Sequence, residues 1–387
     1  MQTDTRSIGV GLIGHKFMGR AHSNALRQVV PFFRPARTPV LECVAGRNAA
    51  ELTAFAADFG WRRITTRWQD LIGDPSIGIV DIATPNHLHA EPAHAALAAG
   101  QHALIEKPLA GSLGDARKLR DSARDALARG VHSYVWFNYR RCPAVGLARS
   151  LVRAGRLGTV RHVRASYLQS WGGAEAPSSW RFEKRLAGSG AHGDLNAHSI
   201  DLARFLLGEE IETVHGAVAR TFHPLRSGPD GMKVPSDVDD ALAFNASFEG
   251  GAIATFEASR VAGPHLNRNT IELNGDGGAL RFDFEDMNVL WFWDAADGAR
   301  EGGWRRIVAT EASAHPWIEH WWPPAHPIGY EHTFTNMVAD VLEALSGRAP
   351  AVPLADVADA YQTQRVLEAA LVAAASGRAV ALTEIPD

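Results

Sequence analysis

The sequence predicts an α/β domain with a doubly wound parallel sheet, followed by an α+β domain with an open, mostly antiparallel sheet. Over the first third, short β-branched runs alternate with longer amphipathic runs. After Pro143, strand-like runs follow one another with turn signals such as NGDGG between them. A chain of 387 residues suits two cores. We therefore expect a dinucleotide-binding domain over residues 1–138 and a substrate-binding and oligomerisation domain over residues 139–387.

Composition and charge narrow the class of protein. Hydrophobic residues make up 46% of the chain and charged residues 21%, which is typical of a folded globular protein. A net charge of −4 gives no electrostatic reason for a nucleic-acid partner, and no apolar run reaches the ~18–20 residues that span a bilayer. Only two cysteines occur, with no leader-like segment. We expect a cytoplasmic protein without nucleic-acid or membrane partners.

The first domain shows a regular βαβ alternation, which is typical of a parallel sheet with helices on both faces. Its elements follow each other without a low-complexity linker. The patterns predict strands at 8–13, 40–45, 77–83, 102–105 and 132–137, and helices at 17–30, 49–59, 87–99 and 113–129.

The second domain begins with a predicted helix at 143–154, a long strand at 159–170 and a helix that starts near Leu195. Alternating Ala252, Ala254 and Phe256 predict an exposed apolar sheet face suited to self-association. Further strands are predicted at 211–221, 241–248, 252–259, 270–274, 279–284 and 289–293, and closing helices at 330–345 and 356–375.

Two overlapping glycine patterns compete for the dinucleotide-binding turn. Gly9-x-Gly11-x-x-Gly14 lies mostly within the first predicted strand, whereas a pyrophosphate turn must join a strand to a helix. The frame Gly14 to Gly19 lies at that junction, although Lys16 replaces its middle glycine. We place the site in the second frame. Lys16 either turns outward at the rim or approaches the pyrophosphate.

The second predicted strand ends without the acidic residue that usually binds the adenosine ribose. Gly46 and Arg47 stand there instead, while Glu42 is too early and Asp58 belongs to the next helix. An arginine after a small residue leans toward NADP, although Arg47 could also be a solvated loop residue.

Ionisable residues follow other predicted strands, at the sheet edge where such folds bind ligands. These include the stretches ATPNHLHA and EKP. Farther along, Asp194 and His198 are four residues apart, so a helix places both on one face, where a carboxylate can orient a basic histidine. Taken alone, this pair also suits a metal half-site or an exposed helix pair, and His192 lies close by.

Five stretches, GLIGHKFMGRAH, ATPNHLHA, EKP, NYRR and AGSGAHGDLNAHSIDLARFL, together resemble the Gfo/Idh/MocA family of nicotinamide-dependent sugar and polyol oxidoreductases. The likeness runs in the same order over essentially the whole chain. The stretches NYRRCPAV, SYLQSW and SSWRFEKRLAGSGAHGD look most like glycoside-oxidising members. Lys16 and Gly46 depart from the family pattern.

The resemblance implies a role for each matching residue. Lys107 is implied to hydrogen-bond the reacting oxygen, Asp194 to bind and orient the substrate, and His198 to be the catalytic histidine. The implied substrate contacts further include Asn138, Tyr139, Arg140, Gln169 and Trp171. The resemblance implies cofactor contacts at Thr84, Pro85, Asn86, His89, Trp180 and Arg181. Together with the residues of the turn, of the second strand's end and of the EKP stretch, the expected cofactor contacts also include Gly14, Lys16, Phe17, Met18, Gly19, Gly46, Arg47, Glu106 and Lys107.

The implied activity is oxidation of a secondary hydroxyl of a sugar, anhydrosugar, glycoside or cyclic polyol with NAD or NADP and no metal. The implied assembly is a homodimer or homotetramer formed through the C-terminal sheet. An NAD-dependent glycosidase and a non-catalytic dinucleotide sensor are the alternatives. Trp171, Trp180, Trp321 and Trp322 could stack on sugar rings, and packing is the competing interpretation for Trp321 and Trp322.

Overall fold

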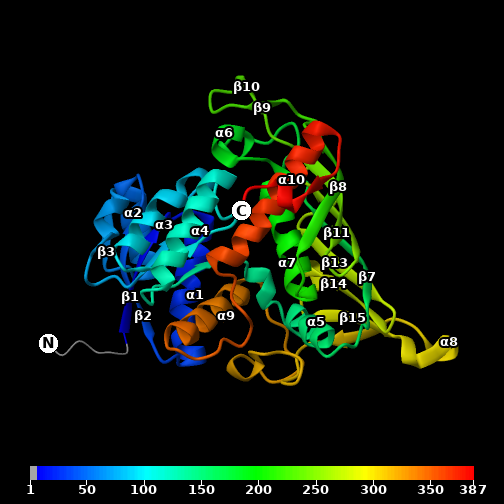
Figure 1. The fold of residues 1–387 in the computed structure, drawn as a ribbon. Helices are drawn as coiled ribbons and strands as arrows, with labels where there is room; N and C mark the ends of the chain where they lie inside the picture. Colours follow the sequence, from blue (N-terminus) through cyan, green and yellow to red (C-terminus); the bar gives the residue numbers. More distant parts are fainter. Residues whose placement is uncertain (1–6) are drawn as a thin grey trace. The chain divides into compact units, whose positions relative to one another are not determined.

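The computed structural model describes residues 7–387, whose contacts form two compact units (Figure 1). The first unit contains the chain up to Arg141 together with Trp317–Pro323 and Ile328–Tyr361. The second contains Cys142–Pro316, Pro324–Pro327 and Gln362–Asp387. The single division that the sequence predicts after residue 138 therefore does not describe these units fully, because a late segment returns to the first one.

The first unit is built on a six-stranded parallel sheet with the strand order β3-β2-β1-β4-β5-β6. This order confirms the doubly wound α/β fold predicted from the sequence. Its strands are β1 (Ser7–Ile13), β2 (Thr38–Ala45), β3 (Arg63–Thr65), β4 (Ile79–Ile82), β5 (His102–Ile105) and β6 (Ser133–Val135), and its helices are α1 (Phe17–Phe33), α2 (Ala49–Phe59), α3 (Ala90–Ala98), α4 (Leu113–Leu127) and α9 (Tyr330–Leu345).

Helix α9 belongs to the first unit because its apolar face completes the core beside α1. Leu26 and Val29 of α1 and Phe334 and Met337 of α9 are all fully or almost fully buried in one cluster with Val10 of β1. A buried side chain of this size contributes about 1.5–3 kcal/mol. Packing between segments more than 300 residues apart thus fixes the helix that follows the glycine turn.

The early glycines Gly9 and Gly11 serve the packing of β1. A Cβ atom added to Gly9 would lie 1.7 Å from the Ser76 carbonyl oxygen, and one added to Gly11 would lie 2.7 Å from Leu71 Cδ2. Both residues lie inside β1, before the turn. Their glycine spacing is explained by neighbouring chain segments and needs no ligand.

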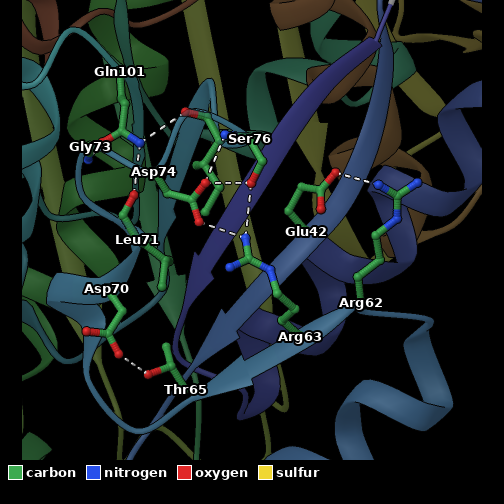
Figure 2. Close-up of polar contacts among 11 residues, drawn as sticks. Glu42, Arg62, Arg63, Thr65, Asp70, Leu71, Gly73, Asp74, Ser76 and Gln101 are labelled. Carbon is green, nitrogen blue, oxygen red and sulfur yellow. Dashed lines mark hydrogen bonds and ion pairs between the residues drawn. The ribbon is translucent and has the colours of Figure 1, made fainter. Parts of the chain in front are cut away.

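Strand β3, which the sequence analysis missed, is short and is held by polar contacts (Figure 2). Arg63 Nη2 donates to Asp74 Oδ2 at 2.7 Å and to Ser76 Oγ at 3.0 Å. Arg62 pairs with Glu42 of β2 at 2.7 Å. Strand β3 consists only of Arg63, Ile64 and Thr65. Three residues are too few to show the alternation that predicts a strand from sequence.

The second unit is built on a nine-stranded sheet in which β7 and β12 are parallel and the other neighbours antiparallel. The order is β16-β15-β14-β13-β7-β12-β11-β8-β17, with a separate hairpin β9-β10. The strands are β7 (Val160–Leu168), β8 (Ile211–Arg220), β9 (Leu225–Ser227), β10 (Lys233–Pro235), β11 (Ala241–Phe248), β12 (Ile253–Ser259), β13 (Arg268–Gly275), β14 (Gly278–Asp283), β15 (Val289–Asp294), β16 (Arg305–Val308) and β17 (Val380–Ala381).

Helices α5 (Pro143–Arg153) and α7 (Ala197–Leu207) pack on one face of this sheet. The short helices α6 (Lys184–Ala187) and α8 (Gly298–Glu301) lie in connections, and α10 (Val357–Ser376) passes from the first unit's residues into the second's. This arrangement confirms the predicted open, mostly antiparallel α+β fold.

The predicted exposed face of β12 is wrong. Ala252, Ala254 and Phe256 are 1–2% exposed and belong to the covered face, whereas Ile253 is 54% exposed. Side chains alternate along a strand, so the apolar row lies under the helices and the intervening row faces outward. The alternation of apolar residues is present in β12, but these residues lie on the covered face of the sheet and not on the exposed face.

No helix within residues 7–387 combines the length and apolar character that a membrane crossing requires.

We predict that Gly9→Ala lowers the free energy of unfolding by about 1–3 kcal/mol or more, because the added methyl group collides with backbone. Urea unfolding measures the change. Gly114→Ala in α4 is the control, since only Ser112 Oγ, at 3.9 Å, lies within 4 Å of its added Cβ. Equal effects of the two substitutions would contradict the packing role of Gly9.

Candidate active site

The turn between β1 and α1 carries the frame from Gly14 to Gly19. Gly14 has φ = 106°, donates its N–H to Ala45 O at 2.9 Å, and would bring a Cβ within 2.5 Å of Ala83 O. A Cβ on Gly19 would lie 2.2 Å from Gly14 O. Only glycine fits these positions, so the N-terminus of α1 stays open to an anion. The turn is suited to a pyrophosphate.

Lys16 extends from this turn toward helix α2. Its ammonium donates to Glu51 Oε2 at 2.5 Å, and His15 Nε2 lies 2.8 Å from the same oxygen. These hydrogen bonds hold the pKa of the Glu51 carboxyl below its usual range. Lys16 is thus exposed at the rim but has a defined partner. Sequence reasoning missed Glu51, because its role depends on Lys16 and His15, which lie 35 and 36 positions earlier.

The loops that follow β4 and β5 are joined by His89. Its fully buried ring places Nε2 2.9 Å from Thr84 O and Nδ1 3.0 Å from Pro108 O. Burial lowers the pKa of His89. His89 therefore holds the start of the predicted cofactor loop, which consists of Thr84, Pro85 and Asn86. Within residues 7–387, the buried Thr84 Oγ1 has no hydrogen-bond partner.

Glu106 of the EKP stretch is anchored on both oxygens. Oε2 accepts the backbone N–H of Lys107 at 3.0 Å, and Oε1 lies 3.1 Å from His22 Nε2. The following Lys107–Pro108 peptide bond is cis. Glu106 is only 5% exposed. Its side chain therefore fixes the backbone that carries Lys107.

His22 bridges two carboxylates at the centre of the first unit. Its Nδ1 lies 3.0 Å from Asp81 Oδ2, and its ring stacks on Trp136 with a centroid distance of 4.0 Å. Burial opposes a charge on this ring, but Asp81 and Glu106 outweigh it and raise the pKa of His22 to about 9. An imidazolium can donate from both nitrogens, so one charged ring satisfies both carboxylates.

Among residues 7–387, no cluster of His, Cys, Asp and Glu is arranged to hold a metal ion.

The predicted substrate residues Asn138 to Arg140 have internal partners in the first unit. Asn138 Nδ2 donates to Thr333 Oγ1 at 2.9 Å, and buried Arg140 pairs with Asp359 at 2.7 Å. The Tyr139 ring lies 6.5 Å from that of Tyr330, which also stacks against exposed Phe17. Residues 330–359 of the first unit thus supply partners to this loop.

Met18, a predicted cofactor contact, is partly buried and packs against the hydrophobic core of the first unit.

In the second unit, Asp194 and His198 lie at the junction of a π-helical turn (His192–Asn196) and α7. His198 is 6% exposed, with its ring 5.9 Å from that of Tyr167. His192 is fully buried, and its Nε2 donates to Leu367 O at 3.0 Å while Nδ1 accepts from Asn196. Burial lowers the pKa of His192. The two histidines therefore differ, and His192 is a core residue.

Asp194 is held by Arg260, a residue that the sequence analysis did not single out. Arg260 Nη2 donates to Asp194 Oδ2 at 2.9 Å, and Nη1 donates to Arg181 O at 3.1 Å. The guanidinium is buried and lies 5.1 Å from the Trp171 ring centroid. The carboxylate is thus oriented by a fixed charge. No short motif could reveal this pairing across 66 residues.

The aromatic residues divide into two groups. Trp171 is 43% exposed and donates to Gln169 Oε1 at 2.5 Å, and Arg181 stacks over the Trp180 ring at 4.5 Å. Trp321 instead packs in the first unit, where its Nε1 donates to Asn336 Oδ1 at 2.8 Å. The packing interpretation of Trp321 is confirmed. Trp322 is 40% exposed, with its ring edge-to-face against Phe32 of α1.

Comparison with known proteins decides the family. Residues 8–133 match the oxidoreductase family model with an NAD-binding Rossmann fold, and residues 145–281 match the GFO/IDH/MocA C-terminal domain. The chain is 39% identical to levoglucosan dehydrogenase of Pseudarthrobacter phenanthrenivorans, over 96% of this chain and 97% of that protein. The chain belongs to the Gfo/Idh/MocA family. The resemblance seen in the sequence is thereby confirmed.

Solved structures agree with this placement. An oxidoreductase domain protein from Kribbella flavida superposes with a TM-score of 0.94 at 45% identity, covering 99% of this chain and 100% of that one. Levoglucosan dehydrogenase in complex with NADH and L-sorbose superposes with a TM-score of 0.91 at 38% identity, covering 98% of this chain and 99% of that one. As a member of the Gfo/Idh/MocA family, the protein is an NAD-dependent oxidoreductase.

We predict that the stability of the fold depends on the charge of His22. Its folded-state pKa of about 9 exceeds its ordinary 6.5, so its stabilisation is complete below about pH 6.5 and is lost as the pH rises through 9. The charge of His22 contributes about 3 kcal/mol in all to the free energy of unfolding. Urea unfolding between pH 6 and 9.5 should show a smaller pH-dependent loss in His22→Gln than in the wild type. Parallel curves for the two proteins would contradict the charged bridge.

Proposed function

We propose that this protein oxidises a secondary hydroxyl of a sugar, anhydrosugar, glycoside or cyclic polyol, with NAD as the hydride acceptor. The near full-length similarity to levoglucosan dehydrogenase carries the proposal. The buried His198, four residues after the Arg260-anchored Asp194, supports it, because alcohol oxidation needs a base close to a hydroxyl-binding group.

The proposed roles follow from the chemistry of each side chain. His198 accepts the hydroxyl proton, and Asp194 binds a neighbouring hydroxyl and orients His198. Lys107 stabilises the developing alkoxide with its ammonium. Arg260 keeps the Asp194 carboxylate in place, since its guanidinium donates a hydrogen bond to it and stays charged at any working pH. Asn138, Tyr139, Arg140, Gln169 and Trp171 remain proposed substrate contacts.

The first unit fits a dinucleotide at the β1–α1 turn, where Gly14 and Gly19 leave room for phosphates. Among the described residues, the buried Thr84 Oγ1 after β4 has no hydrogen-bond partner and can bind the same ligand. When bound, the nicotinamide ring supplies the hydride acceptor. Phe17, Met18, Gly46 and Arg47 are proposed contacts at the same turn and at the end of β2. The lean toward NADP is not supported by levoglucosan dehydrogenase, which has been solved in complex with NADH. Proposed contacts beyond these are Lys16, Pro85, Asn86, His89, Glu106, Lys107, Trp180 and Arg181.

We further propose that the protein works in the cytoplasm.

We also propose that two or more copies associate through the outward face of the nine-stranded sheet. Val218 and Ile253 are 56% and 54% exposed on this face, where Arg164 also pairs with Glu272 at 3.6 Å. Isolated exposed residues are ordinary, but an uncovered sheet face with apolar and paired charged groups suits a second copy.

Association through this face predicts that Val218→Asp lowers the oligomeric state measured by analytical ultracentrifugation, because the new charge would be buried between copies. Leu127→Asp, at an exposed apolar position of α4, is the control and should leave the state unchanged. A wild-type monomer at all protein concentrations would refute the proposal.

The activity predicts that NADH absorbance accumulates when the protein meets levoglucosan, glucose, glucosides or inositols with NAD, and that His198→Ala lowers kcat about 10²–10⁴-fold on the substrate found. The affinity for NAD should change little. Flat absorbance with release of aglycone would identify a glycosidase, and NAD binding without any turnover would identify a sensor.

His192→Asn is the matched control, because His192 is fully buried in the core. It is expected to lower stability and to leave most of kcat in the folded fraction. Near-normal turnover by His198→Ala would refute the assignment of the base.

A further inference from the structure

The end of strand β2 is unusual for a dinucleotide-binding sheet. The second strand of such sheets usually ends in an acidic side chain that holds the adenosine ribose, and an arginine nearby accommodates a 2′-phosphate. Here β2 ends at Ala45 and is followed by Gly46 and exposed Arg47. Taken alone, this position would favour NADP, in contrast to the NADH complexes of the relatives.

The ring of His15 explains why no side chain occupies position 46. A Cβ atom on Gly46 would lie 2.6 Å from His15 Nδ1 and 3.0 Å from Cε1. The His15 side chain is 10% exposed and is held by Glu51. An acidic residue at the usual position would therefore collide with this ring.

The neighbouring acidic residues are directed elsewhere. Glu42, within β2, pairs with Arg62, and Asp70 accepts a hydrogen bond from Thr65 Oγ1 at 2.6 Å (Figure 2). Asp58 lies two turns farther along α2 than Glu51. These three carboxylates do not replace the missing acid.

Glu51 is brought to this position by the start of α2. Asn48 caps the helix, and its Oδ1 accepts the N–H groups of Ala50 and Glu51 at 3.0 and 3.2 Å. Both hydrogen bonds to the Glu51 side chain, from Lys16 and His15, use Oε2. Within residues 7–387, its Oε1 accepts no hydrogen bond, and the side chain is 45% exposed. A directed carboxylate oxygen thus remains available beside the turn that fits phosphates.

We propose that Glu51 selects NAD over NADP by binding the adenosine ribose hydroxyls in place of the missing acid at the end of β2. This inference rests on the proposed use of a nicotinamide dinucleotide. A 2′-phosphate carries about −1.5 to −2 charges and would be repelled by the carboxylate. Lys16 and His15 hold Glu51 in position, and the pairing with Glu51 keeps the Lys16 ammonium from binding a 2′-phosphate.

The test measures binding of NAD⁺ and NADP⁺ by isothermal titration calorimetry, without a sugar substrate. Glu51→Gln should weaken NAD⁺ binding about tenfold and strengthen NADP⁺ binding by a similar factor, because a charged hydrogen-bond partner is lost and Lys16 is released. Adding Lys16→Gln to this variant should abolish the gain for NADP⁺.

Asp58→Asn is the matched control, since it removes one negative charge from the same helix about 10 Å farther along. It should leave the ratio of the two dissociation constants unchanged. An unchanged ratio in Glu51→Gln, or a wild type that binds neither dinucleotide, would overturn the inference. A shifted ratio in a protein that oxidises no sugar would refute the proposed function and leave the role of Glu51 standing.

Discussion

The buried bridge from Asp81 through His22 to Glu106 ties together the elements that carry the first half of the site. His22 comes from α1, Asp81 from β4, and Glu106 from the end of β5. Two carboxylates without the imidazolium would be an uncompensated buried charge, which costs several kcal/mol. The helix after the glycine turn and the loop that carries Lys107 are therefore fixed by one group. Trp136 completes the arrangement by donating its indole N–H to Asp81 at 2.9 Å.

In the second unit, Arg260 has the corresponding role. It joins the π turn at Asp194 to the loop at Arg181 and to the Trp171 ring. π turns are rare and are frequent at functional sites. Two backbone N–H groups at the start of this segment are also fixed by Asp239, whose carboxylate accepts those of Gly190 and His192, each at 2.7 Å. Asp194 is thus held through its carboxylate by Arg260, and the backbone before it is held by Asp239.

Most of the fold followed from periodicity, and much of the site did not. The helix predicted from its pattern over 49–59 matches α2, whose ends are capped by Asn48 and Gly60. Position relative to a strand also separated the glycines of the turn from Gly9 and Gly11. Pattern reasoning failed where function depends on pairs distant in sequence: His22 with Glu106, Arg260 with Asp194, and Glu51 with Lys16. It also placed Phe256 on the wrong face, since a period of two does not say which face is covered.

The return of α9 to the first unit has a consequence for how the chain becomes structured during synthesis. All six strands of the parallel sheet precede residue 136, yet Phe334 and Met337, which complete the core cluster on α1, are made almost 200 residues later. Until then, the apolar strip of α1 has no permanent cover. The nucleotide-binding unit matures only when nearly the whole polypeptide has left the ribosome, and a fragment ending at Arg141 would present that strip to solvent.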